Sequence, residues 1–493
     1  MGDHLAVLQV LVPLLTAPLC VLIPQRRVVR VLTLSACWLA FGIAVALSVR
    51  VATTGAFSYF LGGWAPPFGI EYRIDALATF MLVLVSGIGA VVMTQAEASL
   101  EVEVPYDRYV LFHAMYLLSL AGLLGIVVTG DLFNVFVFLE ISALSGYVLI
   151  SLGQDRRALT AAYQYLIMGT VGATFLLIGI GLLYMTTGTL NMADAAARLP
   201  GVVGSRTVLV AFGFLTVGIS LKMALFPLHL WLPNAYTYAP SVVTAFLAGT
   251  ATKVSVYVLL RFMLTVFGFD YSLGSMPLAT VLMPLAITAM FSASLVAIFQ
   301  QDVKRLLAYS SVAQVGYIVL GVSMASVAGL TGAIVHLANH AIMKTLLFCV
   351  MGCFVYRIGS TRIDDLRGCG RQMPFTMAAF VVGGLSLIGV PLTVGFVSKW
   401  VLVQAALEAG YWPLAVLVLG SSLLAVVYVW RVVEVAYFDE PPPGRDPARE
   451  APLSMLVPVW GLVVATVFFG IDTEWTAGLA LQAATAVGSG GAP

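Results

Sequence analysis

Long apolar segments recur along almost the whole chain, and they constrain its fold more than any other feature. About fourteen of them approach the roughly 20 apolar residues that are needed to cross the hydrocarbon of a bilayer. Of the 493 residues, 61% are hydrophobic and only 10% are charged, whereas a soluble domain carries about 25% charged residues. No soluble core could bury so much apolar surface. We therefore predict an all-α polytopic membrane protein.

Two of the predicted spans, 205–238 and 376–408, are too long for one straight crossing. The first contains Pro227 and Pro233 and the second contains Gly389 and Pro391, so we expect both helices to be broken. The first apolar stretch shows no small-residue cleavage site before Gln25 and is predicted to be retained as a helix. The full set of predicted spans is 5–23, 29–50, 74–95, 109–128, 131–152, 160–187, 205–238, 241–266, 276–299, 306–325, 328–356, 376–408, 412–437 and 452–471.

The distribution of basic residues predicts how the chain is oriented. With the N-terminus outside, most of the basic residues fall in inside loops, as the positive-inside rule requires. We therefore expect a bacterial cytoplasmic membrane protein with both termini outside. The inside set is Arg26, Arg27, Arg30, Arg108, Arg156, Arg157, Lys304, Arg305, Arg357, Arg362, Arg367, Arg371, Arg445 and Arg449, with Arg431 near that side; the outside loops keep Arg50, Arg73, Arg198, Arg206 and Arg261.

Lysine and arginine occupy different kinds of position in this sequence. Only one of the five lysines, Lys304, is assigned to a loop, whereas Lys222, Lys253, Lys344 and Lys399 fall inside predicted spans. A charge at bilayer depth costs at least about 2.5–3.5 kcal/mol, so such residues are usually functional. A desolvated lysine can release its proton near neutral pH, which arginine cannot do. The alternative for a single lysine, above all for Lys399, is a side chain that reaches from a helix end to water.

Glu140 is the acidic counterpart of these lysines. It lies in the middle of the span 131–152, with no other charged residue near it in the sequence. Without a partner it would stay protonated, and an opposing lysine would let it ionise. We expect Lys222 to be that partner. The alternative is a protonated glutamic acid that donates a hydrogen bond to a carbonyl.

His336, His340 and Lys344 form a third polar group. Their spacing places them on one face of a helix, in a stripe about 12 Å long. A neutral imidazole accepts a proton at one nitrogen and donates one from the other, so this stripe favours proton transfer. Two histidines at this spacing could also bind a metal, but no third ligand accompanies them. His229 could line the same path or cap the broken end of its helix, and His113 is interpreted as a packing residue.

The two halves of the chain show a weak internal repeat, with an offset of about 175 to 178 residues. Gly218 and Lys222 match Gly395 and Lys399, and Lys253 falls opposite Arg431. Five spans separate equivalent positions, so the second copy would be inverted, as in many transporters. The predicted domains are an N-terminal segment of three helices (1–108), a first repeat (109–270), a second repeat (271–437), and a loop with a last helix (438–493).

Several of these motifs resemble those of one superfamily. The motifs are Gly130 to Glu140, Lys222 to Pro233, Lys304 to Ser311, His340 to Lys344 and Pro391 to Lys399. They are similar to those of the antiporter-like subunits shared by respiratory complex I and Mrp-type sodium/proton antiporters. Length, the Phe-Asn pair before the glutamate and the lysine of the twelfth span are most similar to the D-type branch of the Mrp antiporter subunits.

This resemblance implies that Glu140, Lys222, Lys253, Lys344 and Lys399 occupy the family's proton-path positions. It also implies a multi-subunit membrane complex, with the other Mrp subunits (A, B, C, E, F and G) as partners and H⁺ and Na⁺ as the transported ions. The chain itself would need no cofactor, metal or nucleic acid. The main alternative is a proton-pumping subunit of a quinone oxidoreductase or a membrane-bound hydrogenase. An intramembrane enzyme is disfavoured, because the sequence has no nucleophile elbow, zinc-protease motif or dinucleotide fingerprint. A structural scaffold would not need four buried lysines.

Overall fold

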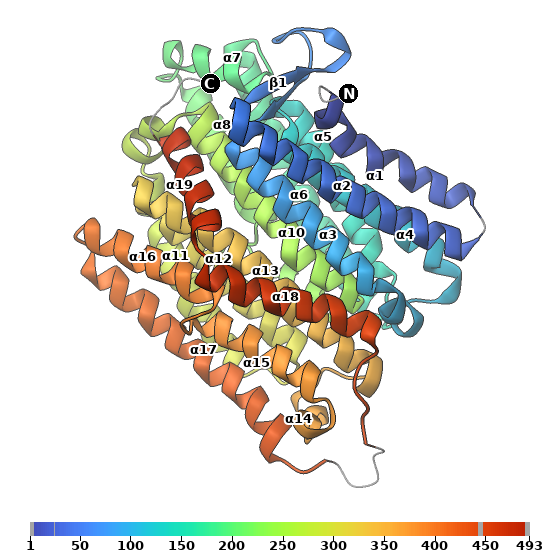
Figure 1. Cartoon of the computed structure of the whole chain (residues 1–493). Coiled ribbons are helices and arrows are strands. Elements are labelled where there is room, and N and C mark those ends of the chain that lie inside the picture. Colours follow the sequence, from blue (N-terminus) through green and yellow to red (C-terminus); the bar gives the residue numbers. More distant parts are fainter. Residues whose placement is uncertain (1–3, 24, 442–446, 489–493) are drawn as a thin grey trace.

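The structure is a computed structural model that describes residues 4–23, 25–441 and 447–488. Within these residues, twelve helices are long and apolar enough to cross a membrane, and they pack into one bundle (Figure 1). The chain is therefore an all-α polytopic membrane protein. The predicted total of about fourteen crossings and the side on which the termini lie stay predictions. Arg445, which the predicted orientation places on the inside, lies outside the described residues.

The continuous helices overlap the predicted spans one by one. The first part of the chain contains α1 (Leu5–Leu22), α2 (Arg26–Thr54), α3 (Ala76–Glu103), α4 (Tyr109–Val128), α5 (Leu132–Ser151), α6 (Arg157–Thr187) and α10 (Ser241–Leu260), which continues as the π-helix η5 (Arg261–Val266). The second part contains α11 (Leu278–Ile298), α12 (Val303–Ser323), α13 (Val327–Ile358), α17 (Trp412–Phe438) and α18 (Leu453–Ile471).

Both of the predicted helix breaks are confirmed. The span 205–238 divides into α8 (Arg206–Lys222) and α9 (Trp231–Tyr238), and the span 376–408 divides into α15 (Pro374–Ile388) and α16 (Val394–Glu408). Gly389 ends α15 with a φ of 94°, a backbone conformation that glycine adopts without steric cost. Each break frees backbone carbonyls inside the bundle, and these need partners there.

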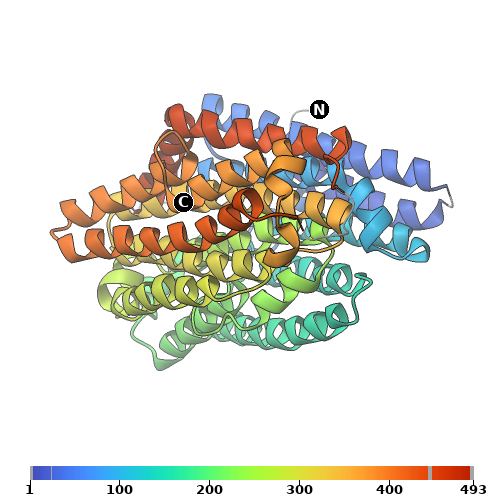
Figure 2. The ribbon, with the colours of Figure 1, turned by 90° about the horizontal axis from the view of Figure 1, so that it is seen from below.

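The helix α13 is the centre of the bundle. It packs against α10 and α12 of the first and second halves, against α15 and α16 on either side of the second break, and against α3 and α18. Figure 2 shows α18 in red beside the blue helices of the N-terminal segment, in agreement with its contact with α3. Because these helices surround α13, its polar residues from Thr331 to Thr345 are buried in the interior of the bundle.

Several smaller elements were not predicted. A hairpin of β1 (Phe57–Phe60) and β2 (Glu71–Ile74), with Phe57 opposite Ile74, lies at the same end of the bundle as the short helix α7 (Met192–Arg198) (Figure 1). The helix α19 (Glu474–Gly488) follows α18 and packs on α13 and α3. These segments are too short or too mixed in polarity to give the signal of a membrane span.

Two basic residues assigned to loops are instead buried. Lys304 lies in the first turn of α12 at 4% exposure, and its ammonium lies 3.6 Å from the carboxylate of Glu103. Arg261 follows the last residue of α10 at 8% exposure and pairs with Asp75. The assignment of both to loops was wrong, because Lys304 lies in α12 and Arg261 lies in η5. Acidic partners at the two ends of α3 make their burial possible.

Candidate functional site

The predicted pair of Glu140 and Lys222 is present. Glu140 lies in the middle of α5, and Lys222 is the last residue of α8, directly before the first break. The Lys222 Nζ lies 3.4 Å from Glu140 Oε1 and donates a hydrogen bond to it. The Lys222 side chain is 5% exposed and that of Glu140 is 24% exposed. The carboxylate therefore contacts the lysine and is itself only partly buried.

Close helix packing brings Lys222 to this position. A Cβ on Gly218 would lie 2.7 Å from the carbonyl oxygen of Gly172, so α8 and α6 approach each other nearly backbone to backbone. A Cβ on Gly172 would lie 3.5 Å from Cγ of Lys222. Small residues are common where membrane helices meet. Here they let the stem of Lys222 lie along α6 and direct its ammonium toward α5.

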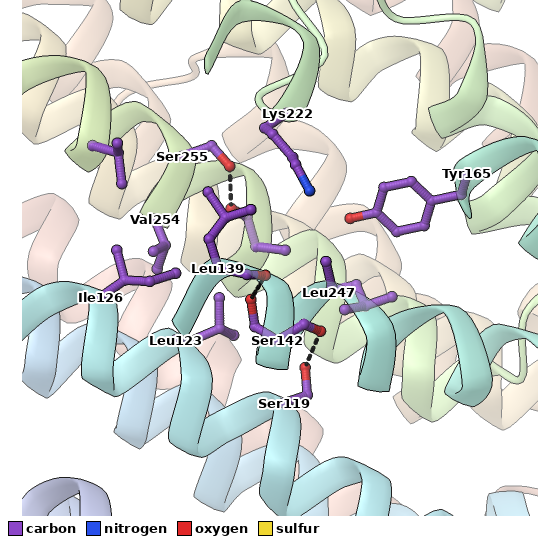
Figure 3. A pocket seen from close by; sticks show the side chains of 13 residues that line it. Ser119, Leu123, Ile126, Leu139, Ser142, Tyr165, Lys222, Leu247, Val254 and Ser255 are labelled. Carbon is purple, nitrogen blue, oxygen red and sulfur yellow. Dashed lines mark hydrogen bonds between the residues drawn. The ribbon is translucent and has the colours of Figure 1, made fainter. Parts of the chain in front are cut away.

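A small cavity extends from Lys222 toward α10. Its volume is about 30 Å³, and it is lined by Lys222, Tyr165, Ser119, Ser142 and Ser255 among apolar side chains (Figure 3). A cavity needs at least about 10–15 Å³ to hold one water molecule. The remaining lining residues from α10 include Leu247, Ala251, Val254 and Val258. The cavity can therefore place water between the lysine of α8 and the helix that carries Lys253.

Lys253 lies inside α10 at 1% exposure. Its ammonium donates hydrogen bonds to the carbonyl oxygen of Ala248 and, at 3.3 Å, to Thr252 Oγ1. No acidic group pairs with it in the described part of the chain. The helix α10 packs against α13, and a Cβ on Gly249, one turn before Lys253, would meet Thr345 of α13. This part of α10 therefore lies beside the polar stripe of α13.

The stripe on α13 is completely buried. His336, His340 and Lys344 are each 0% exposed, and the two imidazole rings are stacked with centroids 6.2 Å apart. Lys344 donates to the carbonyl oxygen of Leu307 at 2.8 Å and to Ser310 Oγ of α12. Within the described residues, no group of three His, Cys, Asp or Glu side chains is arranged as metal ligands. The stripe can instead pass protons between neighbouring rings through water.

Lys399 lies in α16, just after the second break. Its ammonium donates to the carbonyl oxygens of Leu387 at 2.9 Å and Ile388 at 3.0 Å, which end α15. It also lies 4.9 Å from the centroid of the Tyr317 ring. The negative end of the α15 dipole thus holds this cation, and no carboxylate among the described residues pairs with it.

Sequence reasoning missed the residues that connect these groups. His336 Nδ1 lies 2.8 Å from Ser398 Oγ, and Ser398 precedes Lys399 in the sequence. Asn339 donates to the carbonyl oxygen of Val394 at 2.7 Å, which ties α13 to the start of α16. The only sequence signal was that Ser310 and Ser398 each fall inside one of the motifs. A serine in an apolar helix is otherwise indistinguishable from an ordinary packing residue.

Two further histidines, His229 and His113, lie buried outside the stripe of α13. His229 lies between α8 and α9 at 7% exposure, with its ring stacked on Phe226 at a centroid distance of 5.3 Å. His113 of α4 is 1% exposed and packs against Tyr109 and Phe112. The position of His113 agrees with its interpretation as a packing residue. His229 lies near Tyr309 of α12.

The fold and this row of buried cations define a class, namely polytopic membrane proteins that keep titratable side chains in the middle of the bundle. The family model for the transmembrane part of NADH:quinone oxidoreductase and Mrp antiporter subunits matches residues 129–425. The chain belongs to this family.

Relatives of two kinds match nearly the whole length of the chain. It is 44% identical to the N-type subunit of the NADH-quinone oxidoreductase of Desulforudis audaxviator, over 96% of this chain and 97% of that protein. It is 30% identical to the D-type subunit of the Na(+)/H(+) antiporter of Alkalihalophilus pseudofirmus, over 96% of this chain and 94% of that protein. Among solved structures, a chain of the Mrp complex from Dietzia sp. superimposes with a TM-score of 0.91 at 27% identity, covering 100% of this chain and 98% of that one.

Proposed function

We propose that this chain is the proton-translocating subunit of a multi-subunit sodium/proton antiporter. The observation that carries the proposal is the row of buried lysines between Glu140 and the second helix break, namely Lys222, Lys253, Lys344 and Lys399, each at 6% exposure or less. Lys304, which is buried as well, is paired with Glu103 and is not part of this row. Each ammonium is held by few acceptors in an apolar interior. Such a lysine can exist with or without its proton, so protons can pass along the row.

The proposed proton route has four stages. Lys222 exchanges a proton with water in the adjoining cavity, and the neighbouring carboxylate of Glu140 stabilises its charged form. Lys253 receives the proton and passes it to the stripe of His336, His340 and Lys344. Lys399 receives it next and releases it at the second break. Proton transfer needs gaps of about 3 Å or a bridging water, so intervening waters are part of this proposal.

The partial exposure of Glu140 supports the presence of a partner subunit. A carboxylate that is 24% exposed in the middle of a membrane span is costly unless water or another protein surface covers it. We propose that the other subunits of an Mrp-type complex (A, B, C, E, F and G) cover this and other faces. The solved relative in the Mrp complex is also part of a larger assembly.

The second candidate function is a proton-pumping subunit of a redox complex. The 44% identity to the N-type subunit of an NADH-quinone oxidoreductase favours it. The buried residues would have the same roles, and the driving reaction would take place in other subunits. In neither case do we propose that this chain catalyses a bond change of its own.

Transport by the intact complex in vesicles tests the proposal. Sodium and proton fluxes are followed separately after a sodium gradient is imposed. The antiporter proposal predicts proton movement that depends on sodium and needs no electron donor. Proton movement that occurs only when a quinone reductant is supplied would contradict it and favour the second candidate. An absence of proton movement under both conditions would contradict both.

A further inference from the structure

The helix α10, which carries Lys253, is fixed to α3 at both of its ends. At its start, Ser241 donates from its backbone N–H at 2.8 Å and from its hydroxyl at 2.9 Å to the carboxylate of Glu103. After its last residue, Arg261 pairs with Asp75, which caps the N-terminus of α3. Carboxylates are stabilising partners at helix N-termini. The two helices are thus joined by charged groups at opposite ends.

The two ends of α10 are also connected to α12 and α4. Lys304 lies 3.6 Å from Glu103 and donates to the carbonyl oxygen of Ala239 at 3.0 Å, so the start of α12 joins this contact. At the other end, Arg261 donates to the hydroxyl of Tyr257, which in turn donates to the carbonyl oxygen of Val127 in α4. The position of α10 along and across the bundle is therefore fixed by three other helices.

Midway along α10, Gly249 is a point of close approach to both α13 and α3. A Cβ at this position would collide with Thr345 Oγ1 of α13 and would lie 2.8 Å from Ile88 Cγ2 of α3. Gly249 lies four residues, or about one helical turn, before Lys253, and Thr345 follows Lys344. The gap between α10 and α13 at Gly249 therefore determines how far Lys253 lies from the polar stripe.

We propose that α3 is a positioning helix for proton transfer, and that it presses α10 onto α13 at Gly249 so that Lys253 lies within reach of His340 and Lys344. Gly249, Glu103 and Asp75 are positioning residues in this proposal, and none of them carries the proton. The inference rests on the proposed function, because it assigns these residues to the step between Lys253 and α13. It also gives the N-terminal segment a role in transport.

The test uses Gly249→Ala in the intact complex, with Thr345→Ala as the matched control. Thr345 bonds only to the carbonyl oxygen of Ala341 in its own helix, so Thr345→Ala should leave proton flux near the wild-type value. Gly249→Ala should lower the flux by about 10- to 100-fold, because a misplacement of about 1 Å can cost two orders of magnitude in rate. The amount of assembled complex should stay close to wild type.

Two double variants show on which side the added methyl group acts. Gly249→Ala with Thr345→Ala leaves room on the α13 side, so α10 stays near the stripe and much of the flux should return. Gly249→Ala with Ile88→Ala leaves room on the α3 side, so α10 moves away and the flux should stay low. The ratio of flux in H₂O to flux in D₂O should rise in the Gly249→Ala variant, because the lengthened proton transfer becomes rate-limiting. A loss caused by misfolding alone would not change this ratio.

The outcomes separate this inference from the function it rests on. If Gly249→Ala transports at the wild-type rate, or if Ile88→Ala rescues it as well as Thr345→Ala, the positioning role is wrong. Lys253→Met is measured in parallel. If Lys253→Met also transports normally, the proposed route through Lys253 is wrong, whereas an inactive Lys253→Met beside an active Gly249→Ala contradicts only the role of α3.

Discussion

The ammonium of Lys399 lies 2.9 Å from the carbonyl oxygen of Leu387, at the end of α15. The carbonyl end of a helix carries roughly half a negative charge. In the second half of the chain, the end of a helix therefore holds the ammonium of Lys399. In the first half, the carboxylate of Glu140 holds the ammonium of Lys222. The break that follows α15 is what makes these carbonyls available.

Gly389 should be needed for this arrangement. Gly389→Ala places a side chain at a φ of 94° and a Cβ 3.0 Å from Cδ of Lys399. We expect proton flux to fall about tenfold or more, because the ammonium is displaced from the helix end. The matched control is Gly410→Ala, which has a φ of 74° but no atom within 4 Å of the added Cβ. Equal flux in the two variants would show that backbone strain alone, and not the Lys399 contact, explains the effect.

Lys222 should be needed for its proton and not only for its charge. Lys222→Arg keeps a cation beside Glu140 but cannot release a proton at neutral pH. We expect proton flux in this variant to be as low as in Lys222→Ala, with the complex assembled. Flux near the wild-type level in Lys222→Arg would mean that Lys222 acts as an electrostatic anchor.

Ser398 should orient the imidazole of His336. Ser398→Ala removes the hydrogen bond to Nδ1, so the ring loses the partner that fixes its tautomer. We expect a fall in proton flux of roughly three- to tenfold, the kinetic equivalent of one hydrogen bond of about 1 kcal/mol. Ser323→Ala is the control, since Ser323 bonds only within α12. Unchanged flux in Ser398→Ala would remove Ser398 from the path.

The contact of α4 and α5 should depend on Gly122. A Cβ there would lie 2.6 Å from the backbone nitrogen of Ser142 and 2.7 Å from the carbonyl oxygen of Phe138. Gly122→Ala should lower stability by about 1–3 kcal/mol, the usual cost of overpacking. Gly181→Ala of α6, where nothing lies within 4 Å, should be neutral or slightly stabilising. Thermal unfolding of the purified complex compares the two, and equal midpoints would contradict this packing.

Local sequence signals predicted the helices and the ion pair well. Apolar runs gave the spans, Pro227 and Gly389 marked the two breaks, and the isolated acid and lysine in apolar segments predicted the pair of Glu140 and Lys222. Unpaired backbone groups and unpaired charges are costly in lipid, so each of these features needs a specific structural partner. Such signals can therefore be recognised without knowing which helices are neighbours.

Contacts between distant segments could not be predicted. Lys304 lies beside Arg305 in a polar stretch, and only the fold shows that Glu103 buries it. The acceptors of Lys399 are backbone carbonyls, which are the same for every residue type and leave no trace in the sequence. The inverted repeat and the roles of the site residues stay predictions. Lys222 precedes the first break and Lys399 follows the second, so the two lysines are not placed alike.

Sodium-dependent proton flux in Glu140→Gln tests the central claim most directly. The substitution removes the charge beside Lys222 and keeps the volume of the side chain, so the intact complex should assemble in normal amounts. Our account predicts that proton flux falls to the level of vesicles without the complex, because the charged form of Lys222 is no longer stabilised. Wild-type flux from an assembled Glu140→Gln complex would contradict the account.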